Sequence, residues 1–192
     1  MKKVCLLWSA LTFLLFFNVS AQQNIVRLSP LSIAKFKTRI HYERVLAPKV
    51  SAGLMGTAFF GIYPGGRVEP FARFYLSDEA PSGLYLQAKG HYSFNSITVT
   101  STDANSNEVV YDHDFTEYGG SLNLGWQVLA GKNDNIAFDV YTGYRFSSLK
   151  SLDNVNTTTL SNTEAANLAA EVGYRVLHSN LFDLGVSVGY RF

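Results

Sequence analysis

The chain has 192 residues, of which 47% are hydrophobic, 14% are aromatic and only 16% are charged, whereas soluble domains usually carry about 25% charged residues. Its formal net charge is +1 and it contains a single cysteine, Cys5. The sequence therefore offers neither an internal disulfide framework nor the basic excess of a nucleic-acid-binding protein. The length allows one domain, or one domain preceded by a removable leader.

The first residues have the pattern of a cleavable secretory signal peptide. Lys2 and Lys3 precede the apolar run CLLWSALTFLLFF, and the small residues VSA provide a cleavage site. A transmembrane helix is the alternative, but the run is short for a bilayer. We predict a signal peptide at 1–21 and a mature domain at 22–192. Removal of the leader leaves 14 basic residues (16 − 2) against 15 acidic ones, which argues against a nucleic-acid partner.

Apolar residues alternate with small, polar or charged residues along most of the mature chain. The pattern is clearest at the end, where one face holds Phe182, Leu184, Val186, Val188, Tyr190 and Phe192. Similar alternation covers 36–43, 50–62, 67–76, 84–95, 117–128, 135–146 and 167–176. A period of two over these lengths predicts about eight β-strands that are long enough to cross a bilayer at a tilt.

The two faces of these strands differ in chemistry. One is apolar, with aromatic residues near the strand ends, and the other carries Glu, Asp, Lys or Arg on nearly every strand. Charges on so many strands suit a barrel lumen, where opposite signs can pair. We predict an all-β fold, a closed antiparallel transmembrane β-barrel of about eight strands with its apolar face toward lipid. A soluble lipocalin-like barrel or β-sandwich, with the apolar face inward, is the alternative.

The strand count leaves one question open. If the first strand begins near Ser32, the long connections TSTDANSNEVVYDHDF and KSLDNVNTTTLSN fall on the periplasmic side, where turns are normally short. Reading NIVRLSPLSI as a separate strand moves them to the other side but gives nine strands, and an antiparallel barrel closes with an even number. Either a strand is miscounted near the N-terminus, or the two final segments are not both barrel strands.

The final segment GVSVGYRF resembles the closing strand of Gram-negative outer-membrane barrels. In that class, alternating apolar residues and a final Phe are read by the barrel assembly machinery. The resemblance implies that Tyr190 and Phe192 form an assembly signal.

Two internal segments resemble the small outer-membrane β-barrel proteins of Bacteroidetes, which have an OmpA/OmpX-like eight-stranded architecture. HYERVLAPKVSAG contains a Tyr-Glu-Arg strand end at 42–44, and RVEPFARFYLSDEAPSGLYLQA contains Arg-Phe-Tyr-Leu at 73–76. The resemblance implies a fold and an outer-membrane location. It brings no reaction with it.

The inward face is expected to fill the lumen. An eight-stranded barrel is just wide enough for its own side chains, and a buried charge without a partner is costly. We therefore predict a network of mutual salt bridges formed by Arg39, Glu43, Glu69, Arg73, Lys89, Glu117, Asp139, Arg145, Glu171, Arg175, Asp183 and Arg191. A narrow pore or a small polar ligand site is the alternative.

The segment YDHDF raises the question of catalysis. Asp112, His113 and Asp114 could bind a metal or form a base dyad, but adjacent residues of a strand point to opposite faces, and we interpret the segment as a solvated loop. No nucleophile elbow, zinc-protease helix motif or phosphate-binding loop is present. We expect no catalysis, no cofactor and no metal. A lipid-modifying barrel enzyme remains as an alternative.

The predicted function is that of an exported, integral outer-membrane protein with a structural or interaction role. Recognition is assigned to the loops at 100–115 and 150–162. The expected partners are outer-membrane lipid, the barrel assembly machinery and an extracellular ligand or host surface that the sequence does not name. A monomer is expected.

Overall fold

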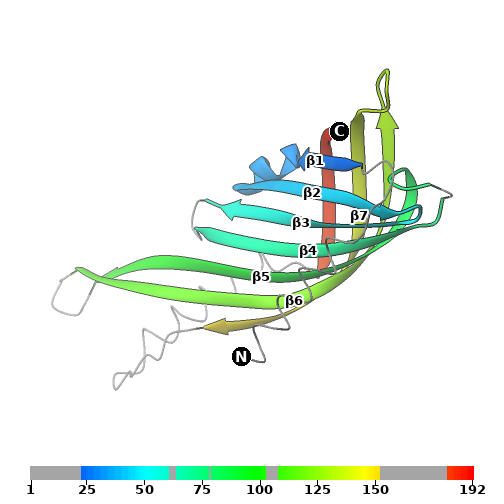
Figure 1. The fold of residues 1–192 in the computed structure, drawn as a ribbon. Helices are drawn as coiled ribbons and strands as arrows, with labels where there is room; N and C mark the ends of the chain where they lie inside the picture. The colour runs from blue at the N-terminus through cyan, green and yellow to red at the C-terminus, as the bar shows by residue number, and fades with distance from the viewer. Residues whose placement is uncertain (1–22, 61–63, 78, 103–107, 152–180) are drawn as a thin grey trace, which may run out of the picture.

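The computed structural model describes residues 23–60, 64–77, 79–102, 108–151 and 181–192, and within these ranges eight antiparallel strands close into a barrel (Figure 1). Each strand pairs with its neighbours in sequence, and the last pairs with the first. The predicted all-β antiparallel barrel of eight strands is confirmed. The strands are β1 Asn24–Leu28, β2 Lys37–Ala47, β3 Val50–Phe59, β4 Gly65–Tyr75, β5 Gly83–Thr102, β6 Glu108–Ala130, β7 Ile136–Ser151 and β8 Phe182–Arg191.

The first strand differs from the sequence-based prediction. Asn24–Leu28 is a strand of its own, and the predicted strand from Phe36 is the second strand, β2. Pro30 begins the 3-10 helix η1, Pro30–Lys35, because proline has no N–H to continue a ladder. The strand at 24–28 was therefore missed, and the count remains eight because β7 pairs directly with β8, so the two final segments are not both strands of the barrel. The predicted strand at 167–176 lies outside the described residues.

The barrel has two different ends. Its terminal end holds Asn24 and Arg191 together with the short β2–β3, β4–β5 and β6–β7 turns. Its loop end carries η1 and the connections that follow β3, β5 and β7, including residues 103–107 and 152–180, which lie outside the described residues. No helix in the described ranges has the length and apolar character needed to span a membrane.

The predicted loop at 100–115 is wrong, because most of it is strand. β5 and β6 remain paired from Asn95↔Phe115 to Thr102↔Glu108, and they extend beyond their neighbours (Figure 1). The segments TVTST and EVVY are rich in β-branched residues, which favour extended backbone. Their polar composition suggested a loop because this part of the hairpin lies past the pairing with β4 and β7.

The register sets the width of the barrel. A path of paired residues leads from Phe138 of β7 once around the barrel and returns to β7 at Ser148, ten residues further along. It passes through Val188, Leu28, Ile40, Gly56, Val68, Tyr92 and Tyr118. Such a stagger tilts the strands, and eight tilted strands enclose an interior that side chains fill.

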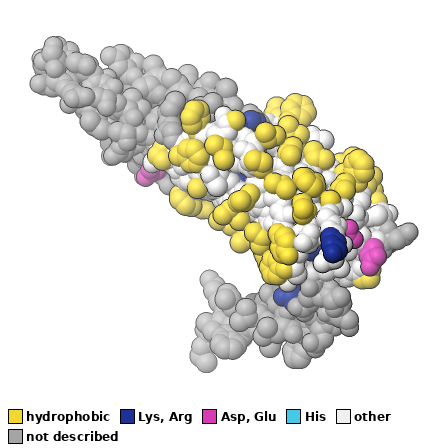
Figure 2. All heavy atoms as spheres, turned by 90° about the horizontal axis from the view of Figure 1, so that it is seen from above, with side chains coloured by type: hydrophobic (Ala, Val, Ile, Leu, Met, Phe, Trp, Pro, Cys, Tyr) yellow, Lys and Arg dark blue, Asp and Glu magenta, His cyan; other side chains and the backbone are white. Residues whose placement is uncertain are grey.

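The polarity of the molecule is reversed relative to a water-soluble protein. Large apolar side chains face outward on every strand, among them Ile40 at 51% and Leu122 at 65% exposure. Figure 2 shows hydrophobic side chains spread over the visible barrel wall. Inside, by contrast, Arg73 is 1% exposed and Glu43 is fully buried. The lipocalin-like alternative required the opposite arrangement.

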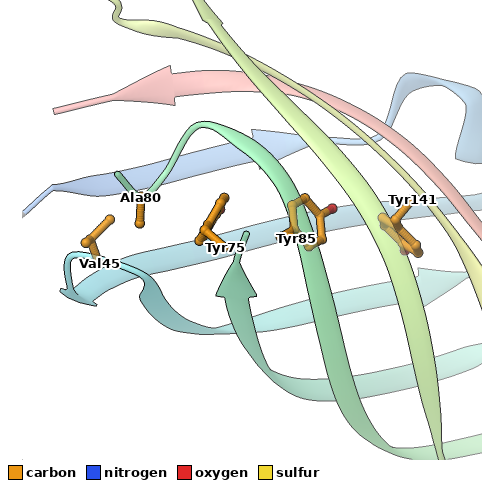
Figure 3. Packing of buried hydrophobic residues seen from close by; sticks show 5 residues of the cluster. All are labelled: Val45, Tyr75, Ala80, Tyr85 and Tyr141. Carbon is orange, nitrogen blue, oxygen red and sulfur yellow. The ribbon is translucent and has the colours of Figure 1, made fainter. Parts of the chain in front are cut away.

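A row of tyrosines and glycines crosses the interior. The paired residues run Tyr75, Tyr85, Gly125, Tyr141 and Gly185. The three tyrosines form one cluster with Val45 and Ala80, in which Tyr75 lies next to these two residues and Tyr141 lies farthest from them (Figure 3). A Cβ added at Gly125 would lie 2.3 Å from the Tyr85 ring, and one at Gly185 would lie 2.2 Å from the Tyr141 ring. Each glycine therefore provides the space that the neighbouring ring occupies.

We predict that Gly125→Ala destabilises the barrel by about 1–3 kcal/mol, because the new methyl group overlaps the Tyr85 ring. The control is Gly56→Ala on the outer face, where an added Cβ meets nothing within 4 Å. Urea unfolding of the detergent-solubilised protein, followed by circular dichroism, measures both. Equal stability of the two variants would contradict the steric argument.

Candidate functional site

The lumen contains three groups of buried charges, and the first is centred on Arg73 near the terminal end. Its Nη1 lies 3.0 Å from Glu43 Oε2, and its two terminal nitrogens donate to the carboxylate of Asp139 at 3.1 Å. The guanidinium also lies 4.2 Å from the centre of the Tyr85 ring. Arg73 thus joins β2, β4 and β7 across the interior.

Glu43 has a complete set of partners. Arg27 Nη2 lies 2.6 Å from Glu43 Oε2, the Tyr75 hydroxyl donates to Oε1 at 2.8 Å, and the Ser51 hydroxyl donates to the same oxygen. The Tyr85 hydroxyl donates to Asp139 at 2.6 Å. With Arg27 and Arg73 against Glu43 and Asp139, this Arg73 cluster is formally neutral.

The second group is centred on Glu69 in the middle of the barrel. Arg145 Nη2 lies 3.0 Å from Glu69 and 2.9 Å from Asp183, and Lys89 Nζ lies 2.5 Å from Asp183. Arg39 lies 3.6 Å from Glu69 and donates to the Tyr141 hydroxyl at 2.9 Å. This Glu69 cluster holds three cations against two carboxylates, so it carries a formal excess of one positive charge.

The third group is a pair nearer the loop end. Arg67 Nη2 lies 2.6 Å from Glu117 Oε2, and both side chains are fully buried. The Ser93 hydroxyl donates to the same oxygen at 3.3 Å, and His91 Nε2 lies 3.6 Å from Glu117 Oε1. The Arg67 guanidinium also lies 5.3 Å from the centre of the Phe59 ring.

These contacts cross the lumen rather than following its wall. Arg73 on β4 reaches Asp139 on β7, Arg145 on β7 reaches Glu69 on β4, and Arg27 on β1 donates to Gln127 on β6. Direct bonds therefore join opposite sides of the barrel. The site is therefore an internal brace built from charged side chains.

The twelve residues singled out in the sequence do not all join this brace. Arg39, Glu43, Glu69, Arg73, Lys89, Glu117, Asp139, Arg145 and Asp183 make the contacts described above. Arg191 lies apart, where it donates to Gln23 and to the carbonyl of Asn133. Glu171 and Arg175 lie outside the described residues.

Sequence reasoning missed several members of the brace. Arg27 was overlooked because the strand at 24–28 was not counted, although its alternation places Ile25 and Arg27 on one face. Tyr85, Tyr141 and Gln127 carry no charge at neutral pH, so a search for charges passed over them. Their position on the inward face of an alternating strand was the available signal.

Two further predictions concern residues outside the charged clusters, namely the assembly signal at the C-terminal end and the YDHDF segment. Tyr190 and Phe192 expose their side chains at the terminal end, and the Phe192 N–H donates to the carbonyl of Asn24. The segment YDHDF belongs to β6 and pairs with β5, so its interpretation as a loop is wrong. Within the described ranges, no group of His, Cys, Asp and Glu has the arrangement of a metal site.

No family model and no curated protein matches the chain. Among solved structures, the N-terminal β-barrel domain of Pseudomonas aeruginosa OprF aligns over 89% of this chain and 97% of its own length, with 11% sequence identity and a TM-score of 0.41. Similarity at this level assigns neither a family nor a function.

We predict that Arg73→Met lowers the free energy of unfolding by about 3–5 kcal/mol, because Glu43 and Asp139 lose their shared buried counter-charge. Arg44→Met is the control, since Arg44 is only half-buried on the outer face of β2. Urea unfolding in detergent micelles measures the difference. A double variant that adds Asp139→Asn removes the carboxylate left without a counter-charge, while Glu43 keeps its pair with Arg27, and it should recover part of the loss. Comparable stability of the two arginine variants would contradict the bracing role.

Proposed function

We propose that the protein is an integral outer-membrane β-barrel with a filled lumen, and that it acts as a structural or interaction protein rather than as a channel or an enzyme. The observation that carries the proposal is the reversed polarity of the closed barrel. An apolar outer wall suits acyl chains, and all backbone groups of a closed sheet can be paired within it.

The asymmetry of the two ends supports an orientation. The turns at the terminal end have two, seven and five residues, whereas the loop end carries the 30-residue connection between β7 and β8 and the extended β5–β6 hairpin. Long connections at one end only are the usual pattern of barrels whose termini face the periplasm. In this orientation the β5–β6 hairpin and the connection at 152–180 face the exterior, where an extracellular ligand or host surface would be met. Export through the signal peptide at 1–21, a monomeric state and contact of Tyr190 and Phe192 with the barrel assembly machinery are parts of the same proposal.

The location is tested by fractionating cells that express the full chain. We expect the protein in the outer-membrane fraction, with faster gel migration before boiling than after, since a closed barrel resists detergent until it is heated. Arg73→Met should show this shift at a lower heating temperature than the unaltered protein. Recovery of a monomer from the soluble fraction without detergent would contradict the proposal.

The filled lumen makes a separate prediction about conductance. Planar bilayers containing the purified protein should show no discrete openings at neutral pH, because the bonds of the Arg73 cluster and the Glu69 cluster cross the interior. Gramicidin added to the same bilayer serves as the positive control. Stable unitary currents that scale with the amount of protein would favour the narrow pore instead.

A further inference from the structure

The wall of the barrel is incomplete at its seam. β1 pairs with β8 only from Ile25↔Arg191 to Leu28↔Val188, so among the described residues no strand pairs with the first half of β8 on that side. The helix η1 occupies this position instead, and between η1 and β8 lies a cavity of about 110 Å³. We call this cavity the seam wedge. Its lining includes Leu31, Lys35, Lys37 and Arg39 on one side and Leu184 and Val186 on the other.

Backbone donors of β8 point into the seam wedge. The Phe192 N–H donates toward β1, to Asn24, and every second residue of a strand directs its N–H to the same side. Leu184 and Val186 therefore direct both their N–H and their C=O groups at the wedge, and in the described part of the chain no backbone hydrogen bond crosses it. A backbone donor in an apolar membrane is costly unless it meets an acceptor.

The charges around the seam wedge are of one sign. Among the described residues, the ammonium groups of Lys35 and Lys37 form no hydrogen bond or ion pair, although Lys37 Nζ lies 6.0 Å from the centre of the Phe59 ring. The charged residues that line the wedge, Lys35, Lys37 and Arg39, are all cations. The adjacent Glu69 cluster adds its own positive excess. The wedge therefore lacks an anion that accepts hydrogen bonds.

Apolar side chains surround the outer mouth of the wedge. Leu31 and Leu184, which line the wedge, are each 63% exposed. A free inorganic ion makes no use of these side chains, whereas a lipid places its headgroup in the wedge and its acyl chain along the wall. The cavity is larger than the roughly 30 Å³ that one water occupies, so it admits a phosphate-sized group.

We propose that the seam wedge binds the phosphate of an anionic lipid. The phosphate oxygens pair with the ammonium groups of Lys35 and Lys37 and accept from the N–H group of Leu184 or Val186, while the acyl chain lies over Leu31 and Leu184. The site extends the membrane location proposed above to a specific lipid contact, and it rests on that location.

Native mass spectrometry of the full chain in detergent tests the site. Phosphatidic acid, which carries a phosphomonoester, should bind roughly tenfold more tightly than phosphatidylcholine, as expected for charge-assisted hydrogen bonds. Lys35→Gln combined with Lys37→Gln should abolish this preference. Lys132→Gln, in the exposed β6–β7 turn at the terminal end, is the matched control and should retain it.

Heat-modifiable migration shows whether each variant is folded, and Lys37→Arg, which keeps the charge, should retain the preference if the double variant does not fold. Equal binding of the two lipids by the unaltered protein, or an unchanged preference in the folded double variant, would overturn the proposal. Displacement of phosphatidic acid by equimolar inorganic phosphate would overturn the assignment to a lipid. If the protein folds in the outer membrane but does not prefer phosphatidic acid, the lipid site is wrong and the proposed location still holds.

Discussion

The structure depends on the pairing of charges that have been removed from water. Moving a carboxylate or a guanidinium out of water costs several kcal/mol, and only close partners with further hydrogen bonds offset that cost. Glu43 meets this condition through two arginines and two hydroxyls, and Arg73 meets it through two carboxylates and a tyrosine ring. Because each charge relies on partners from other strands, the charges hold the strands at fixed separations.

Ring packing and charge pairing are coupled in this interior. Tyr85 fits over Gly125, and from that position its hydroxyl reaches Asp139. Tyr141 fits over Gly185, and its hydroxyl accepts from Arg39. The glycines therefore support the ion pairs indirectly, because a side chain at Gly125 or Gly185 would displace the tyrosine ring whose hydroxyl bonds a charged group. A one-residue slip in register would separate glycine from ring along the whole row.

Alternation was sufficient to predict which face of β2, β4 or β7 lies inside, because a period of two is imposed by strand geometry itself. It could not identify partners, since Arg73 meets Asp139 through the closure and stagger of the barrel rather than through any spacing in sequence. The five-residue β1 was too short to show its pattern clearly. The outer part of the β5–β6 hairpin was predicted as a loop because its composition is polar, although its backbone is extended and paired.

The outer part of that hairpin also fixes how far the protein reaches. Beyond Asn95 and Phe115 the ribbon continues for seven residues on each strand, from Ser96 to Thr102 and from Glu108 to Asp114. At about 3.3 Å per residue, this two-stranded extension is roughly 23 Å long. An isolated pair of strands is only marginally stable in water. These two are continuous with the barrel parts of β5 and β6, which hold them in register. The tip of the paired ribbon, at Thr102 and Glu108, therefore lies about this distance beyond the part of the wall where β5 and β6 still pair with β4 and β7.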